Sequence, residues 1–223
     1  RGKPLLYFRD AEFCFYIGVW AGACFILTFN VWGPVYESFG AALRAAFFQG
    51  TSIMTTTGFV TADFDRWPHA SRILLVLLMF IGGCAGSTGG GMKVVRLLVV
   101  VKKVRREIRR FVRPQAVYAI KLRQKPVDQA AVSHITGFFI IFLMLFGLFT
   151  FLMTFFTPDV ETAFSSVIAT MGNIGPGLAA VGATQNYAAI PTPGKIILTF
   201  TMLLGRLELY TVLIVLLPST WRK

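Results

Sequence analysis

Two glycine-bearing stretches have the composition of a loop that coordinates a cation. They are Thr55-Thr56-Thr57-Gly58-Phe59 and Asn173-Ile174-Gly175-Pro176-Gly177, and each directly follows a short apolar segment. Glycine permits backbone conformations that turn carbonyl oxygens toward one axis, and rings of such oxygens can replace the hydration shell of a potassium ion. Either stretch alone would also fit an ordinary turn outside a membrane. Because the same arrangement occurs twice, we predict a cation filter.

A third stretch, residues 82–91, contains six glycines, one serine and one threonine. One alternative is a phosphate-binding loop, since Gly86 and Gly91 have Walker spacing, but Met92 stands where the Walker lysine belongs. The stretch also interrupts an apolar segment that is long enough to span a bilayer. Non-helical backbone is tolerated at that depth where it lines a cavity. We therefore predict an intramembrane loop beside the cation path, and close helix packing through small residues stays as an alternative.

A lone basic residue, Arg206, lies near the middle of the last apolar segment, and Glu208 follows two positions later. A charge at the bilayer centre costs about 2.5–3.5 kcal/mol, so such residues usually face an interior and find partners. Helix positions i and i+2 do not face each other, so Glu208 is not the expected partner. We predict that Arg206 faces the interior of the protein, and an ion pair with another span is one possible role.

Membrane helices must position these residues. The 223-residue chain is 55% hydrophobic and 14% charged, against about 25% charged in soluble domains. A spanning helix needs about 20 mostly apolar residues, and shorter apolar pieces fit re-entrant elements. The predicted spans are residues 11–31, 71–101, 130–156 and 195–217, and the shorter pieces are 40–54 and 160–171. The sequence therefore predicts an all-α integral membrane protein.

The order span, short helix, glycine stretch, span occurs twice along the chain. We predict two span–pore-helix–span repeats with re-entrant filter loops, in which the second span is broken by the glycine-rich intramembrane loop. Asp159 follows Pro158 and is the expected N-cap of the second short helix. The predicted units are a pore repeat over residues 1–113, a cytoplasmic linker over 114–128 and a second pore repeat over 129–223.

The positive charge of the chain is concentrated beside the spans. The formal net charge is +12, and 12 of the 22 lysines and arginines lie between Lys93 and Lys125. By the positive-inside rule this linker and both termini are cytoplasmic. No stacking aromatic residues are interleaved with the basic run, so we do not expect a nucleic-acid partner. The run from Lys102 to Arg113 is expected to dock a regulator or to contact anionic lipid headgroups.

With these motifs the sequence resembles the membrane subunit of the Trk, Ktr and HKT potassium transporter superfamily. It is closest to the TrkH branch and to the third and fourth pore repeats of its C-terminal half. The motifs are Thr56-Thr57-Gly58-Phe59, Gly82-Gly83-Cys84-Ala85-Gly86-Ser87-Thr88-Gly89-Gly90-Gly91-Met92-Lys93, Asn173-Ile174-Gly175-Pro176-Gly177 and Gly205-Arg206. The resemblance implies a K⁺ filter of Thr56, Thr57, Gly58, Phe59, Asn173, Ile174 and Gly175. It also implies a gate of Gly82, Gly83, Gly86, Ser87, Thr88, Gly89, Gly90, Gly91 and Arg206.

The resemblance further implies how the pathway is assembled. Family members have four repeats around one pathway, so missing N-terminal repeats or a second copy must complete this pore. We expect K⁺ as the transported ion, no bound organic cofactor, a homodimer of the full-length protein, and a TrkA-like cytosolic nucleotide-binding regulatory subunit. The expected location is the plasma (inner) membrane. No nucleophile–base pair or metal cluster is evident in the sequence, so we do not expect an enzyme. The alternative is a membrane enzyme or assembly subunit whose glycine-rich loop binds a phosphorylated ligand.

Overall fold

The computed structural model describes residues 10–113, 115, 118–122, 125–207, 209–216 and 221, and most of them are helical, as predicted. The N-terminal half contains α1 (Ala11–Val31), α2 (Phe39–Met54), the 3₁₀ helix η2 (Phe64–Arg66), α3 (His69–Met79) and α4 (Val94–Val112). A hairpin of β1 (Lys121–Leu122) and β2 (Lys125–Pro126) follows. The C-terminal half contains α5 (Gln129–Met153), α6 (Val160–Met171), η3 (Ala179–Val181), η4 (Tyr187–Ala189), α7 (Thr192–Arg206) and α8 (Leu209–Leu216).

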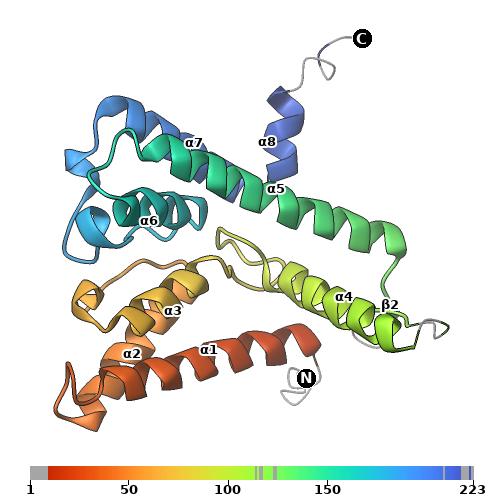
Figure 1. Cartoon of the computed structure of the whole chain (residues 1–223), viewed down its shortest axis with the longest axis horizontal. Coiled ribbons are helices and arrows are strands. Elements are labelled where there is room, and N and C mark those ends of the chain that lie inside the picture. Colours follow the sequence, from red (N-terminus) through yellow and green to blue (C-terminus); the bar gives the residue numbers. More distant parts are fainter. Residues whose placement is uncertain are drawn as a thin grey trace, which may run out of the picture.

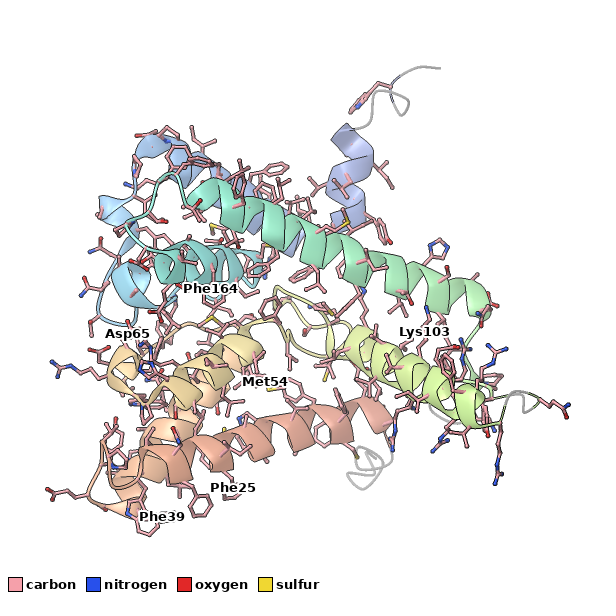
Figure 2. All side chains as sticks on the ribbon, in the orientation of Figure 1. Phe25, Phe39, Met54, Asp65, Lys103 and Phe164 are labelled. Atoms are coloured by element: carbon pink, nitrogen blue, oxygen red, sulfur yellow. The ribbon has the colours of Figure 1, made fainter. Side chains whose placement is uncertain are left out.

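The long helices α1 and α5 lie on opposite sides of the molecule, with α3 and α6 between them (Figure 1). Helices α3 and α6 contact each other and so join the two halves. Phe25 of α1 and Phe39 of α2, labelled in Figure 2, each contact a ring of the other helix, yet both side chains are exposed. Met54, at the end of α2, is fully buried. Apolar side chains therefore cover the outside as well as the core, which is the pattern expected where lipid is the solvent.

Among the described residues, α1 and α5 are the two single helices long and apolar enough to cross a membrane. A third candidate is the pair α7 and α8, which is bent by 116° between the two helices. The second predicted span is divided into α3 and α4 by the loop at residues 80–93, so the predicted interruption of this helix is present. Both predicted short helices are present as α2 and α6. Asp159 caps α6 as predicted, since its Oδ1 accepts a 2.6 Å hydrogen bond from the Thr162 N–H.

The fourth predicted span, residues 195–217, is formed by two helices, α7 and α8, and not by one continuous helix. Helix α7 ends at Arg206, and the chain leaves the helical conformation at Leu207. Arg206 therefore lies at the C-terminal end of a helix, where the helix dipole favours a positive charge, and not in the middle of one. Glu208, which sequence reasoning weighed as its partner, lies outside the described residues, as do the basic residues at the two termini.

An ionic cluster ties the two halves together on the side of η2. Arg72 of α3 donates to the Glu161 carboxylate at the start of α6 and lies 3.6 Å from the Asp65 carboxylate. Asp65 also accepts a hydrogen bond from the Ala179 N–H. Burial raises the pKa of Asp65, and the Ala179 hydrogen bond and the Arg72 charge partly offset that effect. Arg72 therefore holds two carboxylates from different halves of the chain.

We expect Arg72→Ala to lower the free energy of unfolding by about 1–3 kcal/mol. This loss is smaller than for a fully buried pair, because Glu161 is partly exposed. The matched control is Arg66→Ala, whose side chain is 83% exposed beside Asp63 and should contribute less than about 0.5 kcal/mol. Thermal melting of the detergent-solubilised protein compares the two variants. Equal melting points for both variants would show that the Arg72 cluster does not join the halves energetically.

Candidate functional site

The two glycine stretches adopt the same unusual backbone. Thr56 and Gly58 have φ values of 55° and 79°, and Asn173 and Gly175 have φ values of 53° and 112°. In each stretch, two residues in the left-handed region are thus separated by one ordinary residue. A positive φ is uncommon for a residue with a side chain, so Thr56 and Asn173 are held there by their surroundings.

Equivalent hydrogen bonds attach each stretch to its short helix. The Thr56 N–H donates to the Ile53 carbonyl and the Thr57 N–H to the Ser52 carbonyl, at 3.0 and 2.9 Å. In the second half, the Asn173 N–H donates to the Thr170 carbonyl and the Ile174 N–H to the Ala169 carbonyl, also at 3.0 and 2.9 Å. The C-terminal ends of α2 and α6 therefore fix the two stretches in the same way.

The two stretches also contact each other. A Cβ atom added to Gly58 would overlap the Ile174 carbonyl oxygen and would lie 3.3 Å from Cδ of Pro176. Only glycine fits this position, both because of its positive φ and because of this neighbour. A Cβ atom at Gly175 would meet no atom within 4 Å, so that residue borders open space.

Most carbonyl oxygens of the two stretches accept no hydrogen bond from the residues that the structure describes. Among the described residues, no hydrogen bond is donated to the carbonyls of Thr56, Thr57, Gly58, Asn173 and Ile174. Two other carbonyls do accept bonds, at Phe59 from the Ser52 hydroxyl and at Gly175 from the Tyr187 hydroxyl, both 2.6 Å long. Burial raises the pKa of Tyr187, so its hydroxyl keeps the proton that it donates. The unused carbonyls are the groups that a desolvated cation would bind.

The glycine-rich loop packs against both stretches. A Cβ atom at Gly90 would overlap the Gly172 carbonyl oxygen and lie 2.8 Å from Cβ of Asn173. A Cβ atom at Gly89 would lie 3.0 Å from the Thr56 hydroxyl oxygen. Side chains at these two positions would therefore push the loop away from the stretches. The loop closes on itself through a 2.8 Å hydrogen bond from the Gly82 N–H to the Met92 carbonyl.

Two basic side chains bind carbonyl oxygens of this loop. Arg206 Nη1 donates to the Thr88 carbonyl across 118 positions of the chain. Lys93 Nζ donates to the carbonyls of Ser87 and Gly89 at 2.7 and 2.6 Å. Phosphate-binding loops instead turn their N–H groups toward the ligand. The orientation of these three carbonyls toward cations therefore disfavours the alternative of a bound phosphorylated ligand.

A cavity of about 230 Å³ borders the loop. It is lined by loop residues 87–89 and 91, by the basic side chains of Lys93, Arg96 and Arg206, and by residues of α5, α7 and α8. A Cβ atom at Gly205 would overlap the Met171 carbonyl oxygen, so the lack of a side chain there lets α7 lie against the end of α6. That approach brings Arg206 to the loop.

The structure thus brings residues of both stretches, part of the loop and Arg206 into contact, whereas a Cβ atom at Gly86 would meet nothing within 4 Å. Thr56 lies against Gly89, Gly58 against Ile174, Asn173 against Gly90, and Arg206 binds Thr88. The side chain of Phe59 is 73% exposed, and its carbonyl oxygen accepts the hydrogen bond from the Ser52 hydroxyl. Sequence reasoning missed two residues that hold the site, Lys93 and Tyr187. Lys93 ends the glycine-rich motif, which is a usable signal, whereas no pattern singles out Tyr187.

A sequence model described as TrkH, cation transport protein, matches residues 30–222. The chain is 41% identical to the Trk system potassium uptake protein TrkH of Salmonella typhimurium, over 100% of this chain and 46% of that protein. It is 33% identical to the Trk system potassium uptake protein TrkI of Halomonas elongata, over 89% of this chain and 41% of that protein. The crystal structure of the potassium transporter TrkH from Vibrio parahaemolyticus superposes with a TM-score of 0.90 at 38% identity, covering 98% of this chain and 47% of the other. The chain therefore spans about half the length of the relatives that it matches.

Proposed function

Since the chain belongs to the TrkH family of cation transport proteins, we propose that it forms half of a potassium pathway with a filter of backbone carbonyls. It is an integral membrane protein with apolar helices, and its relatives are named as potassium uptake proteins. The filter residues are Thr56, Thr57, Gly58, Phe59, Asn173, Ile174 and Gly175.

The observation that carries this proposal is the matched backbone of the two stretches. Paired left-handed residues and the same two hydrogen bonds recur at Thr56 and Gly58 and at Asn173 and Gly175. Both stretches follow the C-terminal ends of short helices, whose partial negative charge favours a cation. The neighbouring carbonyls that accept no hydrogen bond within the described residues supply the oxygen ligands.

We further propose that the glycine-rich loop is an intramembrane gate. It lies against both stretches through Gly89 and Gly90, and Arg206 and Lys93 hold its carbonyls. The two pore repeats lie over residues 1–113 and 129–223, and the linker lies between them. Each repeat contains one re-entrant helix, α2 in the first and α6 in the second. A cation leaving the filter would meet the loop next. It would then meet the positive charges of Arg206 and Lys93, which bind the loop. Movement of Arg206 away from Thr88 would release one of these attachments.

We propose that the pore is completed by more than the residues of this chain, since the chain spans about half the length of the relatives that it matches. Two carbonyl sets leave a four-sided ring open on two sides, so further repeats or a second copy complete the pore. The location is the plasma (inner) membrane, with the basic linker and both termini on the cytoplasmic side. A TrkA-like cytosolic nucleotide-binding subunit docks on the basic end of α4, and the full-length protein is a homodimer.

The test is rubidium uptake by the complete gene product in cells that lack their own potassium uptake systems. We expect growth at low external potassium and saturable rubidium uptake that exceeds sodium uptake. Gly22 is the position for a matched control, since a Cβ atom there meets nothing within 4 Å and Gly22→Ala should retain full uptake. A well-expressed protein without rubidium uptake, whose Lys93 is protected from amine modification by a nucleotide, would support the phosphorylated-ligand alternative instead.

A further inference from the structure

A strongly basic cavity of about 540 Å³ lies at the end of α4, away from the filter and the loop. Five of the residues that line it are basic. The lining residues come from α4, from the segment before the hairpin and from the first residue of β1: Lys102, Arg105, Arg106, Arg109, Tyr118, Ala119, Ile120 and Lys121. Neither the filter nor the gate proposed above uses this cavity.

The cavity has a defined wall, because its two sides are attached to each other. Ile120 is buried in a small apolar cluster with Val99 of α4 and Val132 of α5. Lys102 Nζ donates to the Lys121 carbonyl at 2.7 Å, and the Val127 N–H donates to the Ile120 carbonyl at 2.8 Å. The segment at residues 118–121 is therefore fixed against α4, and the space between them is a feature of the fold.

The positive charge in the cavity is not balanced within the part of the chain that the structure describes. The acid on this helix, Glu107, lies 3.0 Å from Arg106 and 3.7 Å from Arg110. Arg105 and Arg109 make no ion pair with any described residue. Like charges lining one cavity repel one another, so an anion that enters it gains from several of them at once.

An exposed apolar stripe runs beside the cavity. Val101, Val104, Ile108 and Phe111 follow at intervals of three and four residues and are 38%, 52%, 60% and 89% exposed. Such spacing places them on one face of α4. Arg105 is four residues from Val101 and three from Ile108, so the basic and apolar faces adjoin. Tyr118 adds an aromatic ring of the kind that lies at headgroup depth.

A negatively charged group with hydrocarbon attached to it matches both features. We propose that this cavity binds the phosphate headgroup of an anionic phospholipid, whose acyl chains cover the stripe from Val101 to Phe111. A free phosphate would leave the stripe exposed, and a lipid without net negative charge would leave the cavity positive. The proposed regulatory subunit then contacts the basic residues outside the cavity, such as Arg110 and Arg113.

The experiment measures binding of single lipids to the detergent-solubilised complete protein by native mass spectrometry. Phosphatidylglycerol is compared with phosphatidylcholine of the same acyl chains and with inorganic phosphate. The test variant is R105Q/R109Q, and the matched control R110Q/R113Q removes the same charge from the same helix outside the cavity. We expect R105Q/R109Q to weaken phosphatidylglycerol binding about thirtyfold. This value follows because each arginine near an anionic headgroup contributes about 1 kcal/mol of binding energy. The control R110Q/R113Q should change phosphatidylglycerol binding less than about threefold.

R105K/R109K keeps the positive charge at both positions and should retain most of the phosphatidylglycerol binding. Comparing it with R105Q/R109Q distinguishes an effect of lost charge from an effect of lost folding. Four results would overturn the proposal. The first two are that phosphatidylcholine binds as tightly as phosphatidylglycerol, and that both glutamine variants weaken phosphatidylglycerol binding equally. The third is that inorganic phosphate binds as tightly as phosphatidylglycerol. The fourth is that R105Q/R109Q loses the regulatory subunit but still binds phosphatidylglycerol. Rubidium uptake of R105Q/R109Q is a separate readout, so failure of the lipid site does not imply failure of the proposed ion pathway.

Discussion

Gly58→Ala is expected to reduce selective rubidium uptake at least about tenfold in the complete protein. The added Cβ would overlap the Ile174 carbonyl oxygen, so either that carbonyl or the whole first stretch must move. A residue with a side chain at a φ of 79° also carries a conformational cost of about 1 kcal/mol or more. Displaced carbonyls no longer match a bare potassium ion, and its preference over sodium should fall as well.

Gly175→Ala separates the two causes of the expected loss at Gly58, which are the overlap with a carbonyl oxygen and the conformational strain. Gly175 has a φ of 112° but faces open space, so alanine there adds conformational strain without an overlap. We expect a smaller loss of uptake than at Gly58, with rubidium and sodium uptake measured per folded protein at the surface. If both variants kept the rubidium-over-sodium preference of the parent protein, the filter assignment would be wrong.

Opening of the gate is the second large expected effect. Arg206→Ala should raise basal ion flux on the order of tenfold, because it removes the hydrogen bond to the Thr88 carbonyl and a positive charge that repels cations. Deletion of residues 86–90 should raise it further, since it removes the part of the loop that lies against Thr56 and Asn173. Lys93 still binds the Ser87 and Gly89 carbonyls in Arg206→Ala, so that variant should open only in part.

Arg206→Lys distinguishes the two roles of the arginine. It keeps the charge but loses the planar guanidinium, so a flux between those of the parent and Arg206→Ala indicates that both roles contribute. Flux is measured as rubidium uptake per surface-expressed protein, with and without the cytosolic regulatory subunit. Well-expressed variants with unchanged or lower basal flux would mean that the loop is structural packing and not a gate.

The long apolar elements could be predicted from the sequence because their ends carry local signals. Helices α1 and α6 have the predicted bounds, and Asp10 and Asp159 cap their first turns. The repetition of a glycine stretch after each short helix singled out residues that lie close together in the structure. The repeat was visible because hydrophobicity and glycine are local features of the chain.

The break between α7 and α8 could not be predicted, because contacts distant in sequence accompany it. Residues 195–217 read as one mostly apolar segment, and no proline interrupts them. What distinguishes Arg206 is its distant partner, the Thr88 carbonyl, and what places it there is the approach of Gly205 to the end of α6. Tyr187 illustrates the same limit, since its bond to the Gly175 carbonyl joins a short 3₁₀ helix to the site without any periodic pattern.

The contact between Gly58 and the Ile174 carbonyl has a consequence for how such a protein can change. The shapes of the two glycine stretches depend on each other. The Ile174 carbonyl oxygen of the second stretch occupies the place that a Cβ atom at Gly58 of the first would take. A substitution that widened one stretch would have to be accompanied by a matching change in the other, more than a hundred residues away in the printed sequence. The two halves are therefore a co-adapted pair, and transplanting either one alone into a distant homologue would pair surfaces that were never fitted to each other.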